Sequence, residues 1–144
     1  MSDVRTISNV LRTIPTFKDQ DVSALDCLAE RCSLWQLKPG QVLFAEGDEA
    51  CEVYFLIEGQ IRLTCDTGGG PEVVVGYADT GDVIGEMGII DPAPRSASAR
   101  AVDNATVVVL PGVAFMAMVT EGQSIAVDVL RVLRKSLTYR IRVL

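Results

Sequence analysis

The sequence predicts a mainly β, antiparallel fold with helices on both sides of it. Between residues 34 and 110, short runs rich in valine, isoleucine, tyrosine and phenylalanine alternate with glycine, proline and aspartate, which is typical of short antiparallel strands joined by turns. Before and after this region, apolar residues recur at helical spacing. With 144 residues, 49% of them hydrophobic, we expect one domain over 1–144. It divides into a helical N-terminus at 1–32, a β region at 33–110 and C-terminal helices at 111–144.

Two helices are expected before the β region. Residues 3–13 predict a weak helix that ends before Pro15. A second helix is expected over 20–31, and Asp19 or Asp21 can cap it because an aspartate side chain accepts hydrogen bonds from the first free N–H groups. Four apolar residues of this helix fall on one face, as burial against a core requires: Val22, Leu25, Leu28 and Ala29.

Seven strands are expected in the β region. They lie near 34–37, 41–45, 52–58, 60–65, 72–79, 97–102 and 105–110. Glycine supplies the positive φ that tight turns need, so hairpin turns are expected at Glu58-Gly59 and at Gly68-Gly69-Gly70. Glu58 and Arg62 show no binding pattern and are expected to form an exposed strand pair.

Two more helices are expected after the β region. Pro111 suits the first turn of a helix over about 111–119, and Gly122 separates it from a longer helix that runs from Gln123 to Leu144. Apolar residues recur along the long helix at spacings of three or four: Ala126, Leu130, Leu133, Leu137, Ile141 and Leu144. This seam is as consistent with a coiled-coil dimer as with packing on the chain's own β region.

Composition excludes several kinds of chemistry. The chain has no histidine, which removes histidine-based acid–base catalysis, Ser-His-Asp triads, histidine metal sites and histidine ligation of haem. The four cysteines show no C-x-x-C spacing and are expected to be reduced and mostly buried. We therefore expect a binding module with no catalytic residues, no metal and no cofactor.

Charge is distributed unevenly along the chain. All 19 acidic residues, but only eight of the 13 basic residues, precede Arg131. Such an acidic body is unsuited to DNA or an anionic membrane, and the basic end is attributed to cations that favour a helix C-terminus. No apolar run is long enough to span a membrane and the N-terminus lacks a signal pattern, so a cytoplasmic location is expected.

The strongest functional signal lies between Gly81 and Ala101. Arg95 follows two prolines and is the only basic residue between Leu63 and Ala99. Its planar guanidinium matches a phosphate group bidentately. The residues after it have small side chains, which let the backbone approach a ligand: Ser96, Ala97, Ser98 and Ala99.

A second ligand-binding feature precedes Arg95 by nine residues. Gly85 and Glu86 stand where a short helix is expected to begin, so that free N–H groups face an anion. A glutamate at such a point can accept hydrogen bonds from sugar hydroxyls, as acidic residues do in dinucleotide sites. A phosphate clamp and a ribose acceptor together predict a nucleotide pocket.

The whole segment resembles the phosphate-binding cassette of the cyclic nucleotide-binding domain family. Bacterial catabolite-activator-like regulators, kinase regulatory subunits and nucleotide-gated channels share this cassette. Its two parts stand here as Gly85-Glu86-Met87-Gly88-Ile89 and Pro94-Arg95-Ser96-Ala97-Ser98. Outside it, Leu37-Lys38-Pro39-Gly40, Glu46-Gly47-Asp48 and Tyr54-Phe55-Leu56-Ile57-Glu58-Gly59 resemble the family's spaced turns. The resemblance covers roughly Leu11 to Leu144.

The resemblance implies an antiparallel β-roll, of the double-stranded β-helix or jelly-roll type, with a long C-terminal helix. It implies cyclic AMP or cyclic GMP as the ligand. Arg95 and Ser96 would bind the phosphate and Glu86 the ribose 2′-hydroxyl. The cassette residues expected at the ligand are Gly85, Glu86, Met87, Arg95, Ser96, Ala97 and Ser98.

The resemblance also implies contacts to the base. Val75 and Met87 could pack on it, although ordinary core positions are the stronger reading of both. Ser98 stands where some members carry a hydroxyl that reaches a guanine amino group. In the family the last helix closes over the base, and the candidates there are Ser136 and Arg140, with Ile141 beside them. Arg140 could stack on the purine or be one more solvated arginine.

The expected function is therefore a regulatory module in which ligand binding at the cassette repositions the C-terminal helix. Its expected partners are a cyclic nucleotide and a second copy of the chain through that helix, with no membrane or DNA contact by this chain. Two alternatives remain open. One is the sensor half of a transcription regulator whose DNA-binding part is missing here, and the other is a degenerate scaffold of the same fold that binds no nucleotide.

Overall fold

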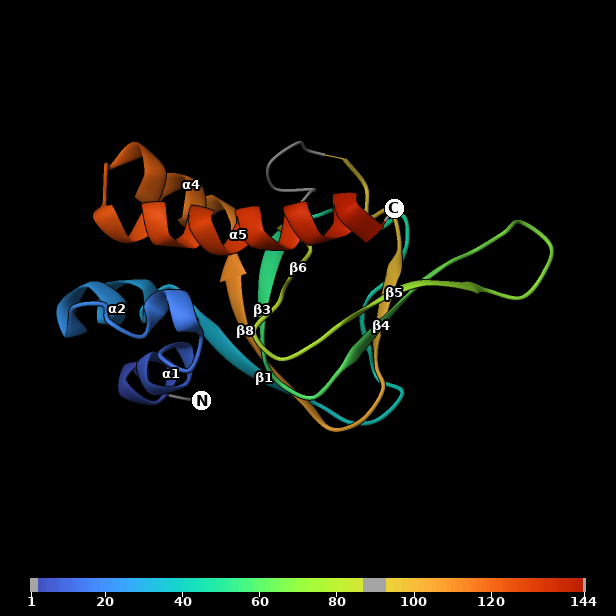
Figure 1. Ribbon diagram of the computed structural model, residues 1–144, viewed down its shortest axis with the longest axis horizontal. Coiled ribbons are helices and arrows are strands. Elements are labelled where there is room, and N and C mark those ends of the chain that lie inside the picture. Colours follow the sequence, from blue (N-terminus) through green and yellow to red (C-terminus); the bar gives the residue numbers. More distant parts are fainter. Residues whose placement is uncertain (1–2, 87–92, 144) are drawn as a thin grey trace.

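The β region forms two four-stranded antiparallel sheets, and the N-terminal and C-terminal helices pack together against the first of them (Figure 1). The computed structural model describes residues 3–86 and 93–143, except for the side chains of residues 133 and 135–143. The mainly β architecture with flanking helices and a long C-terminal helix is as expected from the sequence.

The N-terminal segment forms helix α1 (Val4–Leu11), the short 3-10 helix η1 (Pro15–Phe17) and helix α2 (Val22–Ala29). Asp3 caps α1, because its carboxylate accepts the Thr6 N–H at 2.7 Å. Both helices were expected, although each is shorter than its predicted range.

One detail of α2 was predicted wrongly. Leu25, Leu28 and Ala29 are buried as expected, but Val22 is exposed. Val22 is the first residue of the helix, where the chain has not yet reached the core.

The expectation of mostly buried cysteines is also wrong, since Cys27 and Cys51 are exposed; the cysteines are free.

The first sheet has the strand order β1-β8-β3-β6 and the second has the order β2-β7-β4-β5. The strands are β1 (Ser33–Leu37), β2 (Val42–Phe44), β3 (Glu52–Glu58), β4 (Ile61–Cys65), β5 (Val73–Ala78), β6 (Val83–Ile84), β7 (Ser98–Ala101) and β8 (Ala105–Pro111). Seven of them overlap predicted ranges. The pattern missed β6, because two residues are too few to show a period.

The two glycine turns have different outcomes. Gly68, with φ 81°, lies at the tip of a true hairpin, since β4 pairs with β5. Gly59, with φ 94°, also makes a turn, but it connects β3 of one sheet to β4 of the other. The predicted hairpin at Glu58-Gly59 is therefore wrong, and the predicted exposed pair of Glu58 with Arg62 falls on different sheets. A Cβ on Gly59 would lie 2.5 Å from the Asn104 carbonyl oxygen, so this corner requires glycine.

Strands β3 and β8 lie between two hydrophobic cores. Val53 and Phe55 of β3 face the helices, whereas Tyr54 and Leu56 face the interior between the sheets. Because both faces are buried, these strands read as continuous apolar runs rather than as alternating patterns. The helical core includes Phe17, whose ring meets that of Phe55 edge-on at 5.9 Å.

The C-terminal segment forms α4 (Gly112–Thr120) and α5 (Ser124–Val143). The predicted apolar seam does not behave as one stripe, because Ala126 is buried in the helical core while Leu130 is 44% exposed. Val129 and Val132 are the residues that pack inward beside Ala126. The remaining seam residues, Leu133, Leu137, Ile141 and Leu144, lie outside the described side chains.

Candidate ligand-binding site

Arg95 is held in place by a turn that lies more than forty residues earlier in the chain. Its N–H donates to the Asp48 carbonyl and its carbonyl accepts the Gly47 N–H, both at 2.8 Å. The Asp48 carboxylate accepts the Ala45 N–H at 3.0 Å and closes that turn. The Glu46-Gly47-Asp48 motif therefore positions the arginine backbone.

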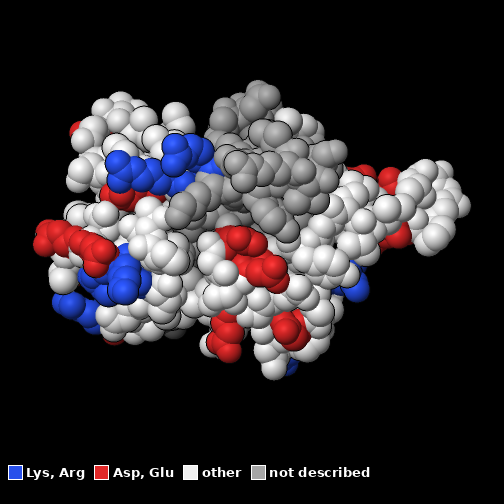
Figure 2. Space-filling view, viewed as in Figure 1, with Lys and Arg blue, Asp and Glu red and all other residues white. Residues whose placement is uncertain are grey.

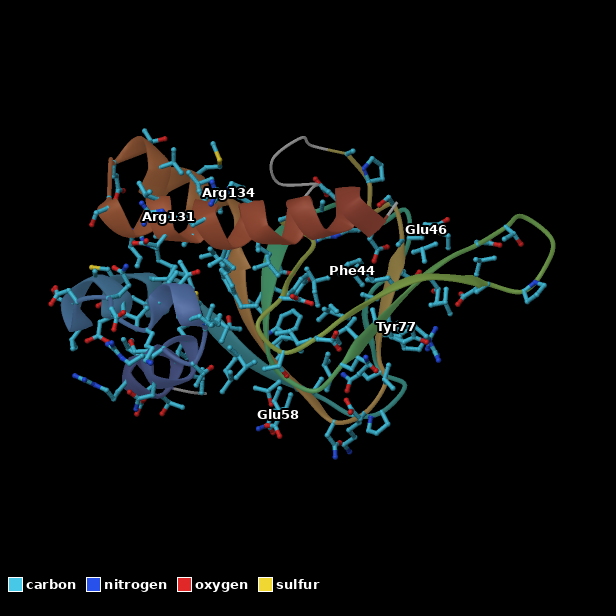
Figure 3. All side chains as sticks on the ribbon, in the orientation of Figure 1. Phe44, Glu46, Glu58, Tyr77, Arg131 and Arg134 are labelled. Carbon is cyan, nitrogen blue, oxygen red and sulfur yellow. The ribbon has the colours of Figure 1, made fainter. Side chains whose placement is uncertain are left out.

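The Arg95 side chain points into the protein, where only 7% of the residue is exposed. Nη1 donates to the Gly85 carbonyl and Nη2 to the Glu52 carbonyl, each at 2.7 Å. The guanidinium carbon lies 4.4 Å from the centre of the Phe44 ring and 5.7 Å from that of Tyr54. Figure 3 labels Phe44 among the side chains of this region. Both rings present their faces to a cation.

Among the residues that the structure describes, this buried cation has only neutral partners. Among the described residues, no carboxylate forms an ion pair with Arg95, and its Nε makes no hydrogen bond. An arginine does not lose its charge in proteins, and burying a charge without a counter-ion costs free energy. The arrangement is therefore electrostatically suited to receive an anion.

Glu52 and Tyr54 both contact the Arg95 guanidinium, Glu52 through its backbone carbonyl and Tyr54 through its ring. The Tyr54 hydroxyl donates to the Glu52 carboxylate at 3.1 Å. Burial, with the neighbouring Glu52 charge as a smaller cause, raises the pKa of Tyr54. Tyr54 therefore stays neutral and donates its hydroxyl hydrogen to the Glu52 carboxylate. The backbone carbonyl of Glu52 accepts the hydrogen bond from Arg95.

Gly85 is a glycine for two reasons. Its φ is 84°, a backbone conformation that other residues adopt only at a cost. A Cβ there would overlap Nη1 of Arg95 and lie 3.3 Å from the Glu52 carbonyl oxygen. The close approach of the Gly85 carbonyl to the guanidinium thus depends on the missing side chain.

The structure places the predicted site residues unequally. It brings the Gly85 carbonyl to Arg95, and the Glu86 side chain that follows is fully buried. Met87 lies outside the described residues, as do the side chains of Ser136, Arg140 and Ile141. Their predicted roles at the base stay predictions.

The small residues after Arg95 mostly contact protein. Ser96 is exposed, and its carbonyl accepts the Cys65 thiol at 3.3 Å. The Ser98 hydroxyl accepts the Glu46 N–H at 2.9 Å. Ala97 is half-buried. Of the described small residues, Ser98 therefore already has a structural role in joining β7 to the Glu46 turn.

Val75 is exposed on the outer strand β5, so the alternative reading of it as ordinary core is wrong. Sequence reasoning also missed Phe44, Glu52 and Tyr54. Glu52 contributes its backbone carbonyl, which no side-chain pattern can reveal. The inward aromatic residues could have been found from their positions on strands next to the predicted cassette.

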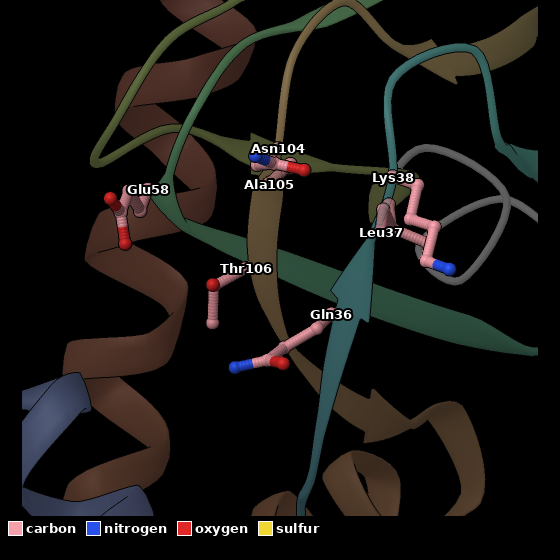
Figure 4. Close-up of a pocket in the computed structure, with 7 residues that line it drawn as sticks. All are labelled: Gln36, Leu37, Lys38, Glu58, Asn104, Ala105 and Thr106. Atoms are coloured by element: carbon pink, nitrogen blue, oxygen red, sulfur yellow. The ribbon is translucent and has the colours of Figure 1, made fainter.

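A separate concavity of about 440 Å³ lies away from the cassette (Figure 4). It is lined by Gln36, Leu37, Lys38, Glu58, Asn104, Ala105 and Thr106. No predicted site residue borders it. In the described part of the chain, no cluster of three or more cysteine, aspartate or glutamate residues could hold a metal ion, and no helix is long and apolar enough to cross a membrane.

Comparisons with known proteins find relatives in sequence and in fold. The "CRP-like cAMP-activated global transcriptional regulator" of Mycobacterium tuberculosis is 25% identical over 131 residues, which cover 91% of this chain and 58% of that protein. A crystal structure of a cyclic nucleotide-binding domain from Methylobacillus flagellatus superposes with a TM-score of 0.80, at 24% identity, over 96% of this chain and 78% of that one.

A third relative is the cAMP-binding acyltransferase of Mycobacterium smegmatis, with a TM-score of 0.71 and 27% identity over 78% of this chain and 35% of that one. The chain thus spans little more than half of the curated regulator and about a third of the acyltransferase. The family model described as the cyclic nucleotide-binding domain matches residues 34–121, from β1 to just past α4. This chain, with its β-roll and its buried cassette arginine, belongs to the cyclic nucleotide-binding domain family.

Proposed function

We propose that this protein is a non-enzymatic regulatory module that binds a cyclic nucleotide, with Arg95 neutralising the cyclic phosphate. The observation that carries the proposal is the buried guanidinium, whose acceptors among the described residues are all neutral. A cyclic nucleotide carries one negative charge on its phosphodiester. Its binding supplies the counter-ion that the arginine lacks among the described residues.

The remaining donors of Arg95 suit this role. A guanidinium has five N–H groups, and the Gly85 and Glu52 carbonyls each accept one. The Nε–H and one N–H on each Nη are left for a ligand. A phosphate can therefore bind in a bidentate manner while the two carbonyls keep the side chain in place, so little reorganisation is needed.

We assign the ribose 2′-hydroxyl to Glu86, which is buried directly after Gly85. Cyclic AMP is the preferred ligand in this proposal. Two relatives support this preference, the cAMP-activated regulator and the cAMP-binding acyltransferase. Cyclic GMP is the competitor against which the preference is measured.

The proposed response to the ligand is a movement of the second half of α5. The first half is fixed, because Ile125, Val129 and Val132 are buried in the helical core. Asp128 adds a polar anchor by accepting a hydrogen bond from the Gln20 amide at 2.7 Å. A ligand-dependent change is therefore expected beyond Val132.

A non-binding scaffold is the second candidate function. The observation that favours it is that Arg95 already makes two short hydrogen bonds to backbone carbonyls, which join the Gly85 turn to β3. In that case the arginine would serve the fold alone. A role as the sensor part of a longer regulator, which the 58% coverage of the tuberculosis protein permits, requires nucleotide binding and is compatible with the first candidate.

Calorimetric titration with cyclic AMP and cyclic GMP separates the two candidates. Binding in the micromolar range or tighter is expected, with a rise in Tm, because a ligand at about 100 times its Kd stabilises the folded state by about 2.7 kcal/mol. AMP is the control ligand, because its phosphate is a dianionic monoester and does not form the cyclic phosphodiester. If neither cyclic nucleotide gives heat or a shift in Tm at millimolar concentration, the scaffold function is the correct one.

A further inference from the structure

The outer face of the second sheet carries a row of side chains that the proposed nucleotide site does not use. In register across the four strands, Val42 of β2 lies opposite Arg100 of β7, Arg100 opposite Arg62 of β4, and Arg62 opposite Tyr77 of β5. We call these four residues the cationic row. Their strand neighbours Ile61, Ala78, Ala99 and Ala101 are buried between the sheets, so the row faces outward because side chains alternate along a strand.

The two arginines at the centre of the row lie side by side, and no carboxylate of the described residues forms an ion pair with either. Side chains directly opposite on antiparallel strands have Cβ atoms about 4.5–5.5 Å apart, and like charges there are destabilising. Arg100 donates to the Gly40 carbonyl at 3.1 Å. Arg62 makes no hydrogen bond or ion pair with any residue of the described part of the chain.

This arrangement is unexpected for a chain of this composition. Nineteen acidic residues but only eight basic ones precede Arg131, so a carboxylate partner would be easy to provide. On the face shown in Figure 2, acidic side chains are spread over the body. Two adjacent arginines without a carboxylate partner among the described residues cost stability, and residues that cost stability are commonly kept for function.

The ends of the row are apolar and open. Val42 is 43% and Tyr77 48% exposed, and Val102, which follows β7, is exposed beside Arg100. Tyr77 is labelled in Figure 3 near the base of the long β4–β5 hairpin. Arginine and tyrosine flanked by apolar residues is the composition of protein interfaces, where both types are enriched.

We propose that the cationic row docks an acidic peptide segment of a partner protein. Two carboxylates of the segment pair with Arg62 and Arg100, and its apolar side chains cover Val42 and Tyr77. Charge complementarity selects this occupant, because the charge of such a segment is confined to the two carboxylates that meet the arginines. A nucleic acid strand carries a charge at every nucleotide and would continue onto an acidic body that repels it, and a symmetric contact centred on the row would set arginines against arginines.

The test uses a short fluorescent peptide in which glutamate alternates with valine, and the same peptide with glutamine in place of glutamate. Fluorescence anisotropy at low and high salt measures the Kd of each. The double variant Arg62→Gln, Arg100→Gln is compared with a charge-matched control, Arg5→Gln, Arg31→Gln. The control arginines form only long surface ion pairs of 3.8 and 3.5 Å, which contribute little to stability.

We expect the glutamate peptide to bind the wild type, with an affinity that falls at high salt, and the glutamine peptide not to bind. The row variant should weaken binding at least about tenfold and the control variant should not. Equal loss in both variants, no binding of the glutamate peptide, or tighter binding of a single-stranded oligonucleotide would each overturn the proposal. Self-association that the row variant abolishes would assign the face to a second copy instead.

A stability measurement tests the premise separately. Arg62→Gln removes the like-charge contact, so its Tm should equal or exceed that of the wild type at low salt, and the difference should shrink as salt screens the charges. A clear decrease in Tm would show that Arg62 is kept for the fold and would remove the reason for the proposal. Neither measurement uses a cyclic nucleotide, so the outcome is independent of the proposed function.

Discussion

Arg95 joins three parts of the molecule through one side chain. Its fork bridges the Gly85 turn and β3, its face covers Phe44, and its backbone is bonded to the Gly47-Asp48 turn. A lysine could not reproduce this geometry, because a compact ammonium lacks the planar fork. The residue proposed to bind phosphate is thus already oriented by the fold before any ligand contributes.

Replacing Arg95 with leucine should weaken cyclic nucleotide binding at least about a hundredfold, because a charge-assisted bidentate contact is lost. Titration calorimetry on the folded variant measures the effect. Glu86→Gln should weaken binding less, since an amide still accepts a ribose hydrogen bond. Arg100→Gln, on the outer face, is the control and should bind like the wild type. Wild-type affinity in Arg95→Leu would show that the cassette is not the binding site.

Gly85→Ala should lower the free energy of unfolding by about 1–3 kcal/mol, because alanine at this φ is strained and its Cβ would overlap Arg95. Denaturant unfolding measures the change. Gly76→Ala is the matched control, since a Cβ there meets only the Leu63 side chain at 4.0 Å. If both substitutions lower the free energy of unfolding equally, the close contact between Gly85 and Arg95 does not contribute to stability.

Cys32 should react with thiol reagents much more slowly than Cys27. Burial raises the pKa of the Cys32 thiol to about 12, its Sγ contacts the Leu28 carbonyl at 3.3 Å, and the thiolate is the reactive form. Cys27 is exposed. Because the pKa of Cys32 is higher in the folded than in the unfolded state, its contribution to stability is fully present below the unfolded-state pKa. That contribution is lost as pH rises toward the folded-state pKa of about 12. Alkylation at pH 8 followed by mass spectrometry gives both rates; equal rates would mean that the N-terminal helices open readily.

At the scale of elements, α5 has two faces with different roles. Ile125, Val129 and Val132 fasten it to the core, while Val127 and Leu130 remain exposed. Arg131 bonds to Asp128 at 2.9 Å and, with Arg134, lies on the part of α5 labelled in Figure 3. Val127 and Leu130 are three residues apart and so lie close together on the open face of the helix, where a second copy of the chain is proposed to pack.

Leu130→Gln should shift the protein from dimer toward monomer and leave Tm nearly unchanged, because the side chain is 44% exposed and contributes little to the monomer core. Light scattering at tens of micromolar measures the mass. Val113→Gln, an exposed apolar residue on α4, is the control and should not change it. A monomeric wild type, with or without nucleotide, would leave α5 with an intramolecular role only.

At the scale of the whole molecule, the two hydrophobic cores stabilise different parts of the fold. The helical core ties α1, α2, α4 and the start of α5 to the first sheet, and the second core fills the space between the sheets. Arg95 lies above the second core, beside Tyr54. The proposed signal from the cassette to α5 would pass between regions that are each well packed, which favours movement of whole elements over gradual distortion.

Cyclic AMP should change hydrogen exchange in α5 beyond Val132 and leave the segment from Ile125 to Val132 protected in both states. The buried side chains of that segment hold it to the core with or without ligand, and local opening follows local packing. Exchange measured by mass spectrometry on overlapping peptides resolves the two segments. A uniform change along α5, or none, would contradict a ligand-dependent movement of its second half.

The sequence by itself determined the local features of this protein. Strand residues, turn glycines such as Gly68 and the order of helices follow from propensities and φ preferences that act over a few residues. The cassette was recognisable for the same reason, since Gly85, Glu86 and Arg95 stand close together in the chain.

Only the tertiary structure decided which elements meet. It assigned β3 and β4 to different sheets, so that the Gly59 turn is a corner rather than a hairpin. It gave Arg95 the carbonyl of Glu52, a backbone group from a distant strand, and it separated Ala126 from Leu130 on α5. These outcomes depend on how apolar faces pack across long sequence separations, and no local pattern encodes the partner that each face will find.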